Sequence, residues 1–236
     1  MSERAATRSA VAAKSREQEA DDDDRVELVL YHDVFCSWCY VADQRLDQLR
    51  DEYKGAVKWT LKGFPLRPED GVPDKKQRQL LARHFRRVAK EAEGKGVRTE
   101  LWTGNDPPIS SMPPLIALEA ALPQGPEKQR QFLLAMRKAA VQDGINVARR
   151  DVLLELASRA GLDVQQLDER LDDPSVRRAV EESTEEAEAH GIRGVPALVI
   201  GGEWLMQGAR DVSEYRQVID KFLVERVAGI RMRILH

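Results

Sequence analysis

The sequence predicts an α/β fold in which a β-α-β unit and a later β-β-α unit build one sheet, with an all-helical insertion between them. Three observations support this. Residues 26–31 and 56–63 have strand patterns on either side of a helical stretch, residues 197–206 have a hairpin pattern followed by an amphipathic helix, and the chain between these units carries mostly helical patterns. We therefore expect a tail (1–25), a core (26–70 and 191–228) and a helical insertion (71–190).

The first unit begins with VELVLY (26–31), a run of branched and apolar residues that predicts a strand entering the core. Apolar side chains then recur at near-helical spacing as far as Tyr53, and Gly55 follows as a stop, so we expect a helix over about residues 38–53. AVKWTLKG (56–63) alternates apolar and polar residues and predicts the second strand.

The insertion consists of apolar helical segments separated by prolines and glycines, which break and cap helices. After it, ALVI (197–200) and EWLM (203–206) flank a Gly-Gly turn, which is typical of a hairpin. An amphipathic helix is expected at about residues 211–226. No repeat or interdomain linker is visible, so the helical region is interpreted as an insertion into the core.

The composition is that of a globular protein and excludes several classes of function. Of the 236 residues, 42% are hydrophobic and 33% are charged, and 37 Lys and Arg stand against 40 Asp and Glu. There is no basic block to bind nucleic acid and no apolar run to span a membrane. Residues 1–25 are polar, end in the acidic run 21–24 and lack a secretory apolar stretch, which predicts a disordered tail and a cytoplasmic location.

Cys36 and Cys39 are the two cysteines of the chain, and two residues separate them. A structural disulfide here removes only about 2 kcal/mol of chain entropy because the loop is so short. A zinc site needs four ligands, and the four histidines show no ligand spacing. We therefore expect a redox-active pair, with no metal and no organic cofactor.

Cys36 falls where the first strand ends and the helix begins. The helix dipole and the main-chain N–H groups of Trp38 and Cys39 are expected to favour its thiolate. We predict that Cys36 is the nucleophile and that Cys39, inside the helix, is the shielded resolving thiol. Cys39 then attacks the mixed disulfide formed at Cys36 and releases the substrate.

HDVFCSWCY (32–40) and GIRGVPALVIGGEWLMQGARDVSEY (191–215) together resemble the DsbA-like thioredoxin superfamily, especially its FrnE-like cytoplasmic branch. The resemblance covers residues 26–226 and implies a thioredoxin-like fold and a disulfide oxidoreductase activity. It also implies that Pro196 is cis and faces Cys36, which leaves the Val195 backbone free to pair with an extended substrate. Many thioredoxin-like proteins carry a buried acid in the first strand, where this chain has Leu30.

Several neighbouring residues are candidates for supporting roles. Trp38 is expected to contact substrate, the alternative being that it packs over the helix. His32 and Asp33 are close enough to tune the redox pair, although a strand-end His and Asp are more often solvated turn residues. Ser37 replaces the proline that the FrnE-like branch often has and is expected to alter the reduction potential. Arg193 is a candidate to stabilise the thiolate, or else a surface charge.

Two other classes of function compete with the oxidoreductase. Kappa-class glutathione transferases and 2-hydroxychromene-2-carboxylate isomerases are similar in plan but generally lack the second cysteine, so Cys39 argues against a glutathione-dependent transferase or isomerase. A noncatalytic binding module is the third hypothesis. The expected partner is a thiol- or disulfide-containing protein or small molecule, with glutathione considered as electron partner or substrate. The direction of electron flow and the choice between monomer and homodimer stay open.

Overall fold

The computed structural model describes residues 25–234, so the predicted disordered tail lies, apart from Arg25, outside the described residues. The strands form one mixed sheet in the order β2-β1-β3-β4, in which β1 pairs parallel with β2 and β3 runs antiparallel to both of its neighbours. Their bounds are β1 Val26–His32, β2 Val57–Gly63, β3 Ala197–Ile200 and β4 Trp204–Gln207.

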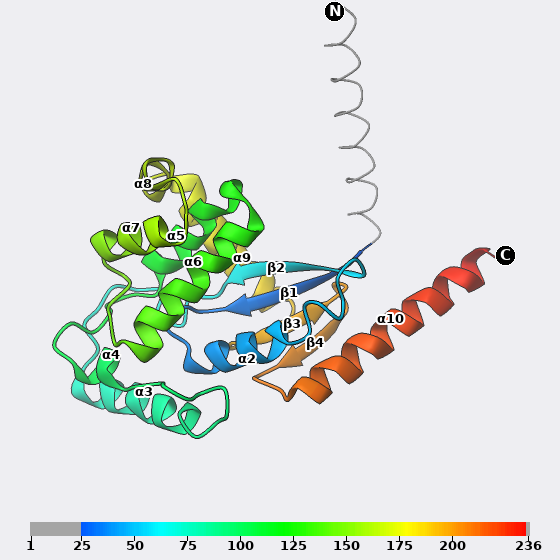
Figure 1. Cartoon of the computed structure of the whole chain (residues 1–236), viewed down its shortest axis with the longest axis horizontal. Helices are drawn as coiled ribbons and strands as arrows, with labels where there is room; N and C mark the ends of the chain where they lie inside the picture. The colour runs from blue at the N-terminus through cyan, green and yellow to red at the C-terminus, as the bar shows by residue number, and fades with distance from the viewer. Residues whose placement is uncertain (1–24, 235–236) are drawn as a thin grey trace, which may run out of the picture.

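Helices follow β1, β2 and β4 in the predicted order, and the helices between β2 and β3 gather mainly at one side of the sheet (Figure 1). A 3-10 turn (Leu122–Gln124) and a π-helix (Lys138–Gln142) extend two of them. The α-helices are α2 Ser37–Asp47, α3 Lys75–Val88, α4 Glu100–Thr103, α5 Met112–Ala121, α6 Pro126–Arg137, α7 Arg150–Arg159, α8 Val164–Leu171, α9 Pro174–Ala189 and α10 Val212–Ile234.

β1 is an inner strand of the sheet and is covered on both faces. Alternate residues of a strand point to opposite faces, so Leu28 and Leu30 pack with α2 and α10, whereas Val29 and Tyr31 face α9. Tyr31 also donates a hydrogen bond to Glu186 of α9 at 2.8 Å. This two-sided burial explains why the strand is a nearly continuous apolar run.

The helical insertion has its own apolar core, and α2 with the turn before it is part of that core. Val34, Phe35 and Val41 pack with buried residues of α3, α5 and α6. Trp102 of α4 meets Phe35 edge-on, with ring centroids 6.1 Å apart. The strand-to-helix turn after β1 is therefore held between the sheet and the insertion.

The helix expected over residues 38–53 ends earlier than predicted, at Asp47. The next residues form tight turns, in which Leu49 N–H bonds to the Leu46 carbonyl. Leu49 and Tyr53 are nevertheless buried against the sheet, so the apolar spacing predicted which residues are buried but not their backbone conformation.

At the other end of the chain, α10 runs further than the predicted 211–226. The short helices α4 and α8 carried no distinct signal in the sequence.

The docking of α10 gives a stability prediction. Ile219 is fully buried against the sheet, whereas Val224 on the same helix is 68% exposed. We expect Ile219→Ala to lower the free energy of unfolding in urea by about 2–5 kcal/mol through the cavity it leaves. Val224→Ala is the matched control and should change it by less than about 0.5 kcal/mol. Equal effects of the two substitutions would mean that α10 is not docked as described.

Candidate active site

Cys36 is the N-cap of α2. Its backbone is extended (φ −77°, ψ 110°), and its sulfur accepts a hydrogen bond from the Cys39 N–H at 3.2 Å. The Cys39 amide was one of the two expected donors. A main-chain N–H at a helix start stabilises negative charge on the sulfur that it contacts. Both cysteines are present as free thiols.

The loop before β3 faces the same sulfur. The Val195–Pro196 peptide bond is cis, and the Cys36 thiol donates to the Val195 carbonyl at 3.5 Å. Pro196 is buried and accepts a hydrogen bond from Gly208 N–H at 2.8 Å, which joins the loop to the end of β4. The structure thus brings together Cys36, Val195 and Pro196, which are 159 and 160 positions apart in the chain.

The two thiols have different environments. Cys36 is 8% exposed, and Cys39 is fully buried. Burial, and then the hydrogen bond and charge of Cys36, raise the pKa of Cys39 well above its ordinary value, while Arg137 acts in the opposite direction. A shielded second thiol agrees with the resolving role expected for Cys39.

His32 and Asp33 are buried, so their interpretation as solvated turn residues is wrong. The Asp33 carboxylate accepts hydrogen bonds from Phe35 N–H at 2.7 Å and Leu66 N–H at 2.8 Å, which ties the turn before Cys36 to the loop after β2. Burial raises the pKa of Asp33, although these hydrogen bonds and Arg137 oppose the shift. Asp33 therefore has a clear structural role at the site.

The His32 ring is uncharged at neutral pH. Burial, and then the positive charge of Arg137, hold the pKa of His32 well below its ordinary value. Among the described residues, neither ring nitrogen has a hydrogen-bond partner. A role for His32 or Asp33 in redox tuning stays a prediction.

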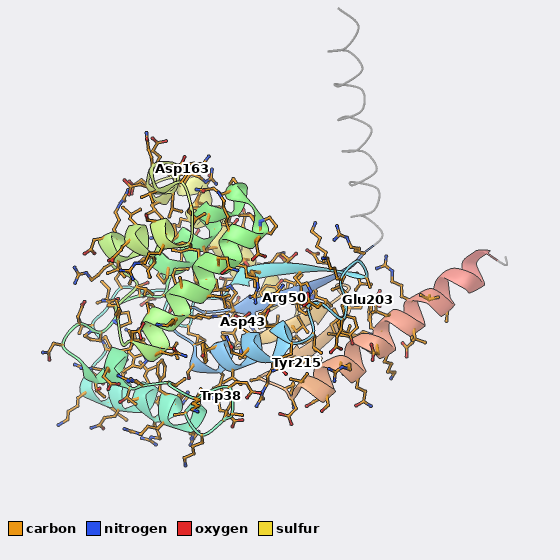
Figure 2. The ribbon with its side chains drawn as sticks, viewed as in Figure 1. Trp38, Asp43, Arg50, Asp163, Glu203 and Tyr215 are labelled. Carbon is orange, nitrogen blue, oxygen red and sulfur yellow. The ribbon has the colours of Figure 1, made fainter. Side chains whose placement is uncertain are left out.

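The remaining predicted residues, Ser37, Trp38 and Arg193, differ in burial and in their contacts near Cys36. Ser37, the first helical residue of α2, is buried. Trp38 is half-buried and packs against the core of the insertion, at the start of α2 (Figure 2). Arg193 is exposed, and the described contacts of Cys36 do not include it. A cation whose charge does act on Cys39 is Arg137, which the sequence did not single out.

Arg137 joins the end of α6 to α2, the helix whose N-cap is Cys36. It is the last residue of α6, is fully buried, and places Nη1 2.9 Å from Oδ2 of Asp43. Asp43 lies one helical turn after Cys39 on α2, and its side chain is 1% exposed. A buried charge pair behind the thiols is thus part of the site.

A pocket of about 200 Å³ adjoins the turn that carries Cys36. Phe35 and Asp33 form one wall, and side chains of α3 and α4 form another. Most of the lining is apolar, so the pocket suits a hydrophobic group carried next to a reacting sulfur. The remaining lining residues are Leu66, Arg67, Gln77, Leu80, Leu81, Trp102 and Ser111.

Within residues 25–234, no three His, Cys, Asp or Glu side chains converge in an arrangement that holds a metal ion. The same residues contain no helix whose length and apolar character suffice to cross a membrane.

Comparison with known proteins identifies relatives over most of the chain. A family model for the DSBA-like thioredoxin domain matches residues 27–220. A curated protein of Halalkalibacterium halodurans, named ClpXP adapter protein SpxH, is 26% identical over a 196-residue alignment that covers 78% of this chain and 63% of the relative. The chain therefore spans less than two thirds of that relative's length.

Solved structures share the fold at lower identity. A candidate protein disulfide isomerase from Nitrosomonas europaea superposes with a TM-score of 0.75 at 19% identity, over 85% of this chain and 98% of that one. The cytosolic disulfide reductase DsbM of Pseudomonas aeruginosa superposes with a TM-score of 0.63 at 22% identity, over 87% and 99%. DsbM has also been solved with GSH. The predicted thioredoxin-like fold with a helical insertion is confirmed.

The unequal burial of the two thiols predicts selective alkylation. Iodoacetamide should modify the folded, reduced protein at Cys36 before Cys39, because only Cys36 has an exposed edge and a helix-start N–H on its sulfur. Intact mass and peptide mapping measure this. Folded Cys36→Ser should react only after denaturation, and equal labelling of both cysteines would contradict the described burial.

The buried neutral His32 predicts a pH dependence of stability. Its folded pKa lies below the unfolded value of about 6.5, so below that pH the unfolded chain binds a proton that the folded protein does not. Stability should therefore fall as the pH is lowered. Between about pH 7.5 and 5.5, wild type should lose about 1.4 kcal/mol more than His32→Gln in urea unfolding. The exposed His84→Gln is the control and should retain the wild-type slope; an unchanged slope in His32→Gln would disprove the assignment.

Proposed function

The chain belongs to the DSBA-like thioredoxin domain family, and we propose that it is a thiol-disulfide oxidoreductase whose Cys36 and Cys39 alternate between dithiol and disulfide. One observation carries the proposal. The Cys36 sulfur meets the helix-start N–H of Cys39 on one side and the Val195 carbonyl, next to the cis Pro196, on the other. This arrangement supports a nucleophilic Cys36 sulfur that lies beside backbone which an extended substrate can approach.

The first step is attack by the Cys36 thiolate on a substrate disulfide. A bond forms between the Cys36 sulfur and one substrate sulfur, the substrate S–S bond breaks, and the other substrate sulfur leaves as a thiolate. The Cys39 N–H stabilises the thiolate before the attack.

The second step is resolution by Cys39. Its thiol loses a proton to water, and the thiolate attacks the Cys36 sulfur of the mixed disulfide. The Cys36–Cys39 disulfide forms, and the second substrate sulfur leaves as a thiolate and is protonated. The protein has then lost two electrons and the substrate has gained them; an external dithiol or two monothiols restore the pair, and the reverse sequence oxidises a substrate.

The substrate is proposed to be a protein or small molecule with a thiol or disulfide. The Val195 carbonyl, which contacts the Cys36 thiol, supports this because an extended chain can pair with the backbone there. Trp38 is proposed as a further substrate contact. The neighbouring apolar pocket lined by Phe35 favours a hydrophobic group beside the reacting sulfur. We further propose a cytoplasmic protein, by analogy with DsbM, which is named as cytosolic. Membership of the FrnE-like branch stays a prediction.

Two alternatives have specific support. The structure of DsbM with GSH supports a glutathione-dependent reaction at Cys36 as one alternative. The curated relative is named as a ClpXP adapter, which favours a noncatalytic binding module. Cys39 discriminates among the three, because only a dithiol couple needs a resolving thiol.

A glutathione redox titration tests the proposal. The protein is equilibrated over a series of reduced-to-oxidised glutathione ratios, quenched with a maleimide and read by intact mass. We expect a reversible two-electron transition that is absent in both Cys36→Ser and Cys39→Ser, and its midpoint sets the favoured direction.

The other outcomes separate the alternatives. Glutathione that stays attached at Cys36 without forming the intramolecular disulfide would replace the proposal with the glutathione-dependent reaction. If the protein shows no transition at any glutathione ratio, the adapter interpretation would replace the proposal.

A further inference from the structure

The α6 helix and the π-helix that follows it attach to α2 at two residues that follow Cys39. Arg137 at the end of α6 pairs with Asp43, four residues after Cys39. Gln142 of the π-helix donates from Nε2 to the Tyr40 hydroxyl at 2.7 Å, one residue after Cys39. Positions four apart lie on the same face of a helix, so Cys39 and Asp43 share the face that α6 covers. In Figure 2, Asp43 is labelled on α2.

A buried ion pair such as Arg137–Asp43 contributes little net stability to a fold. Both side chains are 1% exposed, and a buried ion pair must offset the large cost of removing both charges from water. Among the described residues, Nε, Nη1 and Nη2 of Arg137 and both carboxylate oxygens of Asp43 lack hydrogen-bond partners of good geometry. The Arg137 guanidinium therefore has an ion-pair partner in Asp43 but lacks well-formed hydrogen bonds.

This charge acts on the buried thiol. Arg137 lowers the pKa of Cys39, against burial and Cys36, which raise it. Arg130 of α6 also approaches Asp43, with Nη1 3.7 Å from Oδ1, although its nearer partner is Asp47. The titratable and charged groups around Cys39 are Cys36 from the same motif, Arg137 from α6, Tyr215 from α10, and His32, Asp33 and Asp43, which share Arg137 as a neighbour.

We propose that Arg137 is a positioning residue for the resolving step: its guanidinium stabilises the Cys39 thiolate as that thiolate attacks the mixed disulfide, and Asp43 sets how much of the charge Cys39 experiences. The proposal rests on the dithiol mechanism proposed above. In the step itself, the Cys39 thiol gives its proton to water, a bond forms from its sulfur to that of Cys36, and the Cys36–substrate bond breaks to release a thiolate.

The two members of the pair have opposite expected effects, which separates this role from a structural one. Asp43→Asn removes the anion and leaves the Arg137 charge unopposed, so the Cys39 thiolate should form at lower pH. Arg137→Gln leaves a buried anion, so the thiolate should form at higher pH. Arg137→Lys keeps a positive charge and should stay closer to wild type than Arg137→Gln. A merely structural pair predicts a change of the same direction in both neutral variants.

The test is a stopped-flow reaction of the full-length reduced protein with excess dithiobis(nitrobenzoate), a disulfide whose thiolate is coloured. The first release reports attack by Cys36, and the second reports resolution by Cys39. The rate of the second phase is measured against pH. A lower midpoint is expected for Asp43→Asn and a higher one for Arg137→Gln, with the first phase less affected.

Below the midpoint, a shift of one pKa unit changes the thiolate fraction tenfold. Since nucleophilicity falls as the pKa falls, the net change in rate is about threefold per unit. Arg150→Gln, which disrupts an exposed ion pair with Asp168 and Asp172, is the control and should leave both phases unchanged.

Midpoints that shift in the same direction, or that do not shift, would overturn the inference. If Arg137→Gln does not fold, Asp43→Asn decides alone: an unchanged or raised midpoint refutes the role of Arg137. A wild-type protein without a second phase would instead refute the dithiol mechanism, so the two failures are distinguishable.

Discussion

The position of Cys36 depends on the buried carboxylate of Asp33. Its two oxygens accept hydrogen bonds from the Phe35 and Leu66 amides, so one side chain fixes the turn that leaves β1 and the loop that leaves β2. Charge-assisted hydrogen bonds to backbone amides are stronger than neutral ones and constrain geometry closely. With the turn fixed, Cys36 falls at the helix cap, and its sulfur meets the Cys39 amide and the loop before β3.

α2 has two apolar faces with separate partners. Leu46 packs with the sheet and α10, whereas Tyr40 and Val41 pack with the helices of the insertion. The insertion therefore contributes directly to the site through Arg137 and through the wall of the apolar pocket. This explains why a helix of 11 residues, too short to be stable by itself, holds Cys36 in a fixed position at its start.

The features that could be predicted from the sequence are the local ones. Strands β1 and β2 and the hairpin follow from apolar patterning within a few residues, and the helix-start position of Cys36 follows from those boundaries. The approach of Val195 and Pro196 to Cys36 came from the family resemblance. The role of α6 was missed because the pairing of Asp43 with Arg137 spans 94 positions and leaves no periodic signal. One indication was present: Arg137 continues the buried stripe of Phe132, Leu133 and Met136, where a charge requires a partner.

The hydrogen bond from the Cys36 thiol to the Val195 carbonyl occupies the acceptor that the proposed mechanism offers to a substrate backbone. A thiolate has no proton to donate, so ionisation of Cys36 leaves that carbonyl without this donor. In the proposed mechanism, an amide N–H of an incoming chain can then take its place as donor. In the proposed mechanism, a single atom, the Val195 oxygen, thus links substrate binding to the presence of the thiol proton.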